Sequence, residues 1–222
     1  MHCPVIPICF RSVSVLETAL LVLLAGFQQC VLVHTDTLLP PEVSQHNGTL
    51  YGVCKVRPSS SLPDGLPKIY GQVLLKQDHP QGKLQVLLGF SGFPTEGSPE
   101  SRAVHIHQYG DLSRGCDSTG GHYNPYGVNH PNHPGDFGNL VPQQGKISAL
   151  IESDATLFGG LSVFGRTVVI HERIDDLGRG GDAGSLLHGN AGRRLACCVI
   201  GIASSSRWDM QYKRYGRQLR RY

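Results

Sequence analysis

The chain has 222 residues, of which 40% are hydrophobic and 17% charged, so it is long enough for one large or two small domains and too apolar for a charge-driven disordered protein. Its 28 glycines and 14 prolines approach one residue in five, which favours a turn-rich β protein over a helix bundle. Residues 207–222 hold six of the 20 basic residues and one of the 17 acidic ones, so a body of net charge −2 precedes a tail of +5.

An apolar run near the start of the chain predicts secretion. Residues 18–27 form its core, which is too short for the ~20 residues of a membrane-spanning helix. A basic residue precedes the run, as is typical of a secretory signal. We predict a signal peptide over residues 1–33, cleaved between residues 26 and 35, and no membrane span in the mature protein. Gln28 and Gln29 argue against a longer N-terminal anchor.

The cysteine count agrees with an oxidising compartment. Cleavage of the signal would remove three of the seven cysteines, Cys3, Cys9 and Cys30. The four that remain are an even number, which suits two disulfides in a secreted protein. They are Cys54, Cys116, Cys197 and Cys198.

An N-terminal segment over residues 34–67 separates the predicted signal from the first clear strand. It contains the triplet Asn47-Gly48-Thr49, an acceptor sequence for an N-linked glycan. Behind a signal peptide, this triplet makes Asn47 a candidate glycosylation site. The proline- and serine-rich stretch 57–67 is typical of a loop.

Alternating apolar residues predict short strands from residue 69 onward, joined at first by a turn at 78–82. The predicted strands are 69–75, 84–90, 103–107, 146–152, 167–172 and 196–202. Two long stretches crowded with glycine, proline, asparagine and aspartate lie between them, at 108–140 and 173–195. Loops of this length inside a compact domain are usually functional. No helical period is evident before the tail.

Six histidines gather where a β-sandwich could bring them together. His105 and His107 alternate along one predicted strand, so their imidazoles point the same way, and His171 ends a later strand. The long loop adds His122, His130, His133 and Asp136. Three imidazoles and a carboxylate suit zinc, and four imidazoles suit copper. Scattered surface histidines would explain any two of these residues but not six.

Seven short motifs carry a family resemblance. They are Val104-His-Ile-His-Gln-Tyr-Gly-Asp111, Gly115-Cys116, Gly121-His-Tyr-Asn-Pro125, His133-Pro-Gly-Asp136, Gly165-Arg-Thr-Val-Val-Ile-His-Glu172, Asp175-Asp-Leu-Gly-Arg-Gly-Gly181 and Gly189-Asn-Ala-Gly-Arg-Arg-Leu-Ala-Cys197. In order and spacing, from about Ile69 to Ala203, they resemble the copper/zinc superoxide dismutase family. The secretory start, the doubled cysteine and the basic tail resemble its extracellular branch.

The resemblance implies an all-β domain over residues 68–206. Its fold would be a Greek-key β-sandwich, a flattened eight-stranded barrel with a metal-binding loop and an electrostatic loop. It implies a homo-oligomeric enzyme, a dimer or tetramer, that converts two superoxide ions and two protons to O₂ and H₂O₂ by Cu(II)/Cu(I) cycling. The alternative is a non-catalytic copper/zinc-binding or metal-delivery protein on the same fold. Superoxide turnover by metal-loaded protein separates the two.

The resemblance also assigns the metal ligands residue by residue. The copper ligands are His105, His107, His122 and His171. The zinc ligands are His122, His130, His133 and Asp136. His122 would bridge the metals as an imidazolate and pass on a proton. Asp175 would link a copper histidine to a zinc histidine from outside the ligand shell, and Arg194 would attract superoxide beside the copper.

The remaining implied features concern sulfur and the second loop. Cys116 and Cys197 match the disulfide within each subunit of the family. We predict that Cys54 pairs with Cys198; the alternative is a free Cys198, with Cys54 pairing between chains. Residues 182–188 lack most of the charges usual in the family. Their last residue, His188, is expected to lie at the channel mouth and not to bind a metal.

The tail over residues 207–222 is a candidate polysaccharide-binding segment. Its basic residues are Arg207, Lys213, Arg214, Arg217, Arg220 and Arg221. On a helix, the aromatic stripe of Trp208, Tyr212, Tyr215, Leu219 and Tyr222 would lie opposite these basic residues. Arginine suits sulfate because its planar fork can donate paired hydrogen bonds. We predict binding to a heparan sulfate- or heparin-like polysaccharide of matrix or cell surface. Secretion disfavours nucleic acid, and an inert tail is the alternative.

Overall fold

The computed structural model describes residues 40–97 and 100–219. The predicted signal peptide, its three cysteines, Arg220 and Arg221 lie outside the described residues. Among the described helices, none is both long enough and apolar enough to cross a membrane.

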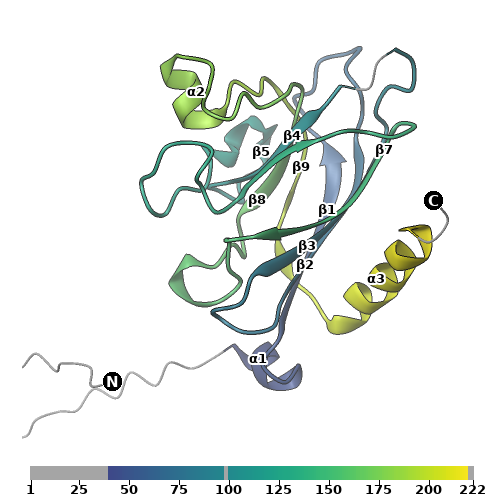
Figure 1. Ribbon diagram of the computed structural model, residues 1–222, viewed down its shortest axis with the longest axis vertical. Helices are drawn as coiled ribbons and strands as arrows, with labels where there is room; N and C mark the ends of the chain where they lie inside the picture. Colours follow the sequence, from purple (N-terminus) through teal and green to yellow (C-terminus); the bar gives the residue numbers. More distant parts are fainter. Residues whose placement is uncertain (1–39, 98–99, 220–222) are drawn as a thin grey trace, which may run out of the picture. The chain divides into compact units, whose positions relative to one another are not determined.

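Eight strands form one continuous antiparallel path, in the order β6-β4-β8-β9-β1-β2-β3-β7. They are β1 (Leu50–Pro58), β2 (Tyr70–Gln77), β3 (Leu84–Ser91), β4 (Arg102–His107), β6 (Asp136–Leu140), β7 (Lys146–Ser153), β8 (Thr167–His171) and β9 (Arg194–Val199). The sheet curls so that β6 and β7, the two ends of the path, approach each other (Figure 1). This nearly closed barrel confirms the predicted all-β fold.

The other elements are short, apart from one helix. Two further strands are β5 (Ser113–Cys116) and β10 (Gly201–Ile202), and the latter pairs with β1. The helices are α1 (Pro41–Gln45), α2 (Ala183–His188) and α3 (Ser205–Leu219), with 3-10 turns at Asp117–Thr119 and Gly159–Leu161. The long loop 108–140 contains β5 and β6, and the loop 173–195 contains α2.

Alternation along the strands fills the interior of the barrel. The inward-facing side chains form one apolar cluster that includes Val56, Val73, Leu88, Ile106 and Ile170. All five are essentially inaccessible to solvent. Burial on this scale is the main source of stability for such a fold, and it provides a rigid base for β4 and β8.

Strand β1 lies inside the segment that the sequence assigns to the N-terminal region. It pairs with β2 on one side and with β9 on the other, so the barrel begins well before residue 68. Its alternation is present, with Cys54 and Val56 buried and Lys55 exposed. Gly52 and Pro58 interrupt the β-forming pattern of the strand, which explains why the sequence does not reveal it.

Candidate metal centre

Two adjacent strands and one loop bring four imidazoles together. His105 and His107 project from β4, and His171 ends β8, which pairs with β4. The loop after β5 adds His122, which forms an isolated bridge with His107. The ligand nitrogens of these four buried side chains all lie within 4.8 Å of one another.

A second cluster shares His122 with the first. Its members are His122, His130, His133 and Asp136, and their ligand atoms also lie within 4.8 Å of one another. One carboxylate, Asp136, is the common contact. Its Oδ1 lies 2.9 Å from His122 Nδ1, and its Oδ2 lies 2.8 Å from His130 Nδ1 and 2.9 Å from His133 Nδ1.

Each unshared imidazole is oriented by an oxygen atom outside the clusters. His107 Nδ1 lies 2.9 Å from the Gly120 carbonyl, and His171 Nδ1 lies 3.3 Å from that of Gly192. His133 Nε2 lies 3.1 Å from the Val128 carbonyl. Because a carbonyl oxygen only accepts, each of these nitrogens carries the proton. The other ring nitrogen is left with a lone pair that can bind a metal.

Asp175 orients one histidine from each cluster. Its Oδ2 accepts a hydrogen bond from His105 Nε2 at 2.8 Å, and its Oδ1 accepts one from His130 Nε2 at 2.7 Å. The carboxylate is itself buried, and Oδ1 also accepts from the Leu177 amide at 2.7 Å. A single side chain therefore fixes the ring orientation and tautomer of both histidines.

Buried nitrogens without partners show that the residues fit metal ions. In the described part of the chain, four buried imidazole nitrogens have no hydrogen-bond partner: His105 Nδ1, His122 Nε2, His130 Nδ1 and His133 Nδ1. The last two lie within 2.9 Å of Asp136 Oδ2 but make no hydrogen bond with it. An unpaired buried polar atom costs free energy, so four in two adjoining clusters indicate cation ligands. Four imidazoles suit copper, and three imidazoles with a carboxylate suit zinc.

Burial keeps three of these rings in the neutral form that binds metals. Burial, and then the neighbouring imidazoles, hold the pKa values of His107 and His171 well below the usual range. Burial also lowers the pKa of His122 to about 4 against the opposing hydrogen bond to Asp136. Burial acts in the same direction on His130, but Asp136 and Asp175 outweigh it and raise its pKa to about 9.

The pKa values predict how the metal-free protein responds to acid. His122 binds its proton at about pH 4 when folded and at about 6.5 when unfolded. The unfolded chain therefore takes up more protons in this window, and stability falls as the pH drops from 6.5 to 4 by about 3 kcal/mol from this residue alone. The raised pKa of His130 adds stability to the folded protein that is fully present below pH 6.5 and is lost only as the pH rises through about 9. Urea unfolding of chelator-treated protein should show this acid-side loss; constant stability from pH 6.5 to 4 would contradict it.

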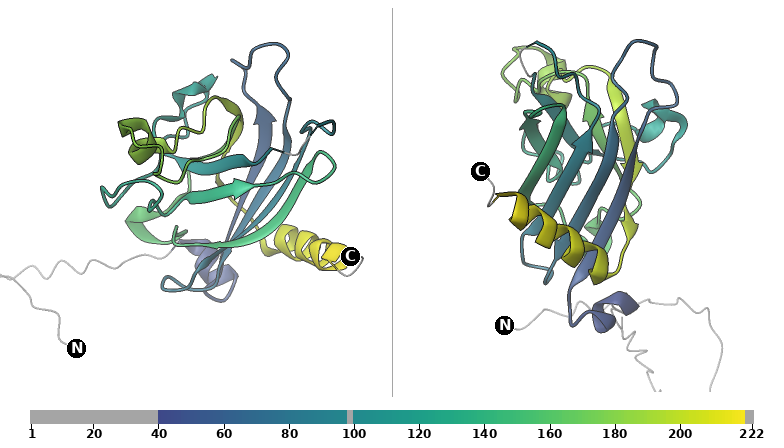
Figure 2. Two further views of the ribbon diagram at one scale, coloured as in Figure 1. Left: turned by 45° about the horizontal axis from the view of Figure 1, so that its top comes forward. Right: turned by 90° about the vertical axis from the view of Figure 1, so that its right-hand side faces the viewer.

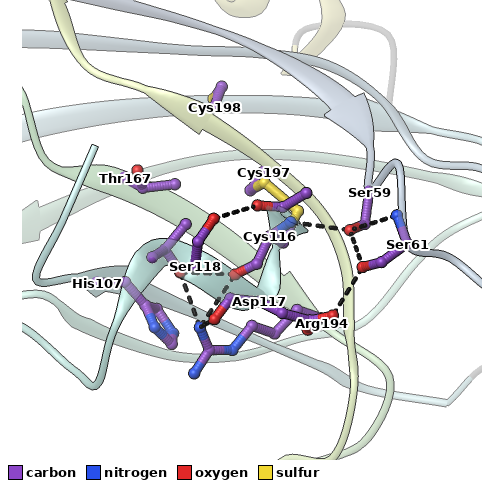
Figure 3. Close-up of a disulfide and its surroundings, with 12 residues drawn as sticks. Ser59, Ser61, His107, Cys116, Asp117, Ser118, Thr167, Arg194, Cys197 and Cys198 are labelled. Atoms are coloured by element: carbon purple, nitrogen blue, oxygen red, sulfur yellow. Dashed lines mark hydrogen bonds between the residues drawn. A yellow bond between two sulfur atoms is a disulfide. The ribbon is translucent and has the colours of Figure 1, made fainter. Parts of the chain in front are cut away.

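Arg194 lies at the edge of the first cluster and is held by the Cys116–Cys197 disulfide loop. It is paired with His171 across β8 and β9. Its Nη1 donates to the Cys116 carbonyl at 3.0 Å and to Thr119 Oγ1 at 2.9 Å. Figure 3 shows the guanidinium below the loop that begins at Cys116 and beside His107. Burial lowers the pKa of Arg194, but a guanidinium stays protonated in proteins, so the site keeps a fixed cation.

Both disulfides occur in the structure, each with ordinary geometry between the Cα atoms. The Cys116–Cys197 Cα atoms are 5.8 Å apart, and those of Cys54 and Cys198 are 5.4 Å apart. The two adjacent cysteines can serve different partners because successive side chains of a strand point to opposite faces. Cys198 packs in the barrel core, whereas Cys197 faces the loop (Figure 3).

A cleft of about 860 Å³ leads to the first cluster. His107, His122, His171 and Arg194 line it, and Leu186, Leu187 and His188 of α2 line its mouth. The Asp182 side chain caps α2 by accepting from the Ser185 amide, and Gly189 ends the helix in a left-handed conformation. His188 is exposed and accepts from the Asn190 amide at 3.3 Å, outside both clusters.

Comparison with known proteins identifies the family. The family model described as copper/zinc superoxide dismutase matches residues 69–200. The chain belongs to the copper/zinc superoxide dismutase family. It is 47% identical over 176 residues to the extracellular superoxide dismutase [Cu-Zn] of Homo sapiens, covering 79% of this chain and 73% of that protein. It is 49% identical over 165 residues to the Rattus norvegicus protein of that name, covering 74% and 68%.

A copper/zinc superoxide dismutase of Schizosaccharomyces pombe is more distant, at 42% identity over 147 residues, covering 63% of this chain and 94% of that protein. These matches confirm the family predicted from the motifs, the enzyme class, and copper and zinc as cofactors. They also confirm a secreted, extracellular protein, because three relatives that are 47–49% identical over most of the chain are named extracellular.

Sequence reasoning missed two residues that support the site. Asn139 Nδ2 donates to the Asp175 carbonyl and its Oδ1 accepts from the Asp175 amide, both at 2.8 Å. Thr119 accepts from Arg194 and donates to the Cys116 carbonyl at 2.8 Å. Neither residue type is a metal ligand here, so the pattern of histidines and carboxylates gave no signal for them.

Proposed function

We propose that this chain is a secreted superoxide dismutase whose active site is the pair of histidine clusters joined by His122. The observation that supports this proposal most is that the two clusters share His122. One buried ring contacts Asp136 through Nδ1, while its Nε2 is unpaired beside His105, His107 and His171. Such a ring could offer one nitrogen to each of two metal sites. The test is to count copper and zinc per chain and to measure superoxide turnover of the loaded protein.

We assign the ligands as the motifs predicted. Copper would be held by His105, His107, His122 and His171, and zinc by His122, His130, His133 and Asp136. When bound, copper supplies one-electron chemistry between Cu(II) and Cu(I), and zinc supplies charge without redox chemistry. The chain itself fixes ring orientation through Asp175 and the backbone carbonyls, so little reorganisation is needed when the metals bind.

The chain also supplies a cation and a proton-holding atom to the reaction. Arg194 offers its guanidinium in the cleft that leads to the copper cluster, where a small anion would be attracted. His122 Nε2 is the ring atom that faces this cluster without a partner. We propose that this atom holds a proton during turnover.

A non-catalytic metal-binding or metal-delivery protein is the alternative, and no observation favours it. Turnover by the loaded protein decides between the two. We also propose, from the family resemblance, that the chain assembles as a homo-oligomer, either a dimer or a tetramer. Sedimentation of the secreted protein tests this assignment.

Asn47 is proposed to carry an N-linked glycan. It is exposed in the turn after α1 and before β1, where an attached sugar would meet no core residue. Thr49, the third residue of the acceptor triplet, is partly buried and donates to Asp78 Oδ1 at 3.2 Å. A loss of mass on Asn47→Gln would test the modification.

We further propose that the tail keeps the enzyme on a sulfated polysaccharide of matrix or cell surface. The described part of the tail is the helix α3, and four of its basic residues are exposed: Arg207, Lys213, Arg214 and Arg217. Arginine pairs well with sulfate because it donates two parallel hydrogen bonds.

Removing the tail is expected to weaken polysaccharide binding without affecting catalysis. Protein ending at Ser206 should elute from a heparin column at much lower salt and keep full dismutase activity, because α3 lies on the sheet away from the metal clusters. Replacing Arg207, Arg214 and Arg217 with glutamine should lower the elution salt while leaving the helix in place. Unchanged elution of the truncated protein would place binding elsewhere.

A further inference from the structure

Helix α3 lies across the outer face of the barrel and leaves a groove along one side. Figure 2, in the right-hand view, shows it crossing β1, β2, β3 and β7. Trp208, the single tryptophan of the chain, is buried against Tyr51, Leu74 and Leu87. The groove has a volume of about 1050 Å³ and lies between this helix and the four strands.

The strand register explains where the helix sits and where the groove begins. One outward-facing row of residues, paired from β1 through β7, is apolar and contacts α3. It consists of Val53, Leu74, Leu87 and Leu150. The next row along the strands is polar or small, so the sheet recedes there. It consists of Lys55, Gln72, Gly89 and Ser148.

The groove floor is open at its centre. A Cβ built on Gly89 would meet no atom within 4 Å, so this position leaves room for a ligand. Four strands at ~4.8 Å spacing give the floor a length of about 14 Å. This length and the polar floor suit a short, extended, hydrogen-bonding chain.

The charge of the groove is positive along both edges. Arg207, Arg214 and Arg217 line it from the helix, and Lys55 and Lys146 line it from the outer strands. No acidic side chain is among the described residues that line it. Arg207 and Arg214 are seven residues apart, two helical turns, and so share one flank of α3.

The other flank of the helix has a different charge. There the next row of the sheet, Tyr51, Lys76, Gln85 and Glu152, holds one cation and one anion. Lys76 is paired with Asp78 at 3.0 Å, so this flank has mixed charge. The positive groove is therefore confined to one side of α3. This asymmetry selects an anionic ligand that lies alongside the helix, with cations facing it from the helix and from the sheet.

We infer that a sulfated polysaccharide binds in this groove, between α3 and the sheet, and that Lys55 and Lys146 of the barrel take part in binding. The inference rests on the proposed polysaccharide binding of the tail and adds its geometry: the barrel supplies half of the site. A tail acting alone as a basic peptide would need neither lysine.

The first test removes the barrel lysines. In the full-length secreted holoenzyme, Lys55→Gln with Lys146→Gln should weaken binding of a size-defined heparin oligosaccharide about ten-fold by calorimetry, the loss of two charge-assisted contacts. A matched control, Lys68→Gln with Lys83→Gln, removes the same charge from lysines outside the groove and should change affinity less than about two-fold.

The second test fills the groove without changing charge. Gly89→Phe places a ring above the floor, in a strand position that tolerates aromatic residues, and should weaken oligosaccharide binding comparably. If both groove variants bind like the control while truncation after Ser206 still abolishes binding, the tail binds alone and the inference is wrong. If truncation leaves binding intact, the proposed function of the tail fails.

Discussion

Replacing His171 with alanine is expected to abolish superoxide turnover while zinc stays bound. His171 belongs to the copper cluster alone, and its Nε2 lies 3.2 Å from His107 Nε2, where both nitrogens face the same point. Loss of this ring leaves copper with three imidazoles and opens the cluster to the cleft. The zinc cluster keeps all four of its ligands. Elemental analysis should therefore find zinc near one per chain and copper strongly depleted.

Asp136→Ala is the complementary change. This carboxylate contacts the three imidazoles of the zinc cluster, and together they hold its pKa well below its usual range even though burial alone would raise it. Zinc should be lost first and thermal stability should fall. His79→Ala, in the exposed turn between β2 and β3, is the control and should keep both metals. Equal loss of both metals in both ligand variants would refute two separate sites.

Replacing Asp175 with alanine is expected to weaken both metals together. The carboxylate binds neither ion in our assignment, but it accepts from His105 at 2.8 Å and from His130 at 2.7 Å, one ring of each cluster. Without it both rings can rotate or change tautomer. Loss of such an outer hydrogen bond typically costs 10- to 100-fold in metal affinity. Competition with a chelator, measured separately for copper and zinc, should show both losses.

The adjacent acid provides a matched control for this experiment. Asp176 lies in the same loop and has the same charge, but it accepts from Ser185 Oγ at 2.7 Å and from Asn190 at 2.8 Å and contacts no cluster histidine. Asp176→Ala should loosen the loop around α2 and leave metal affinity close to that of the original protein. Unchanged affinity in Asp175→Ala would show that His105 and His130 keep their orientation without this carboxylate.

The alternation of apolar and polar residues predicted most of the barrel, because a strand that buries one face has an apolar residue at every second position. The strands expected at 69–75 and 84–90 correspond to β2 and β3 within two residues. In β1 the same signal is weakened by Gly52 and Pro58. The six-residue helix α2 is shorter than two turns, so no helical period could reveal it.

The site residues were visible because histidine and aspartate have few other reasons to recur at fixed spacing. The residues that orient them were not, since Gly120, Gly192 and Val128 act through backbone carbonyls that any residue possesses. The tail shows the same limit. Its aromatic stripe was evident. Of the members whose side chains the structure describes, Trp208 and Tyr215 pack on the barrel, while Tyr212 stacks on Trp208 and stays exposed.

The position of α3 also determines how the protein behaves as a solute. The helix covers the apolar row that crosses four strands, including Leu74 and Leu87, and seals it with the single tryptophan. Proteolysis before Arg207 would uncover that row as a continuous hydrophobic strip, and such strips promote self-association. A trimmed enzyme would therefore be prone to self-association. The intact tail therefore protects the barrel from self-association.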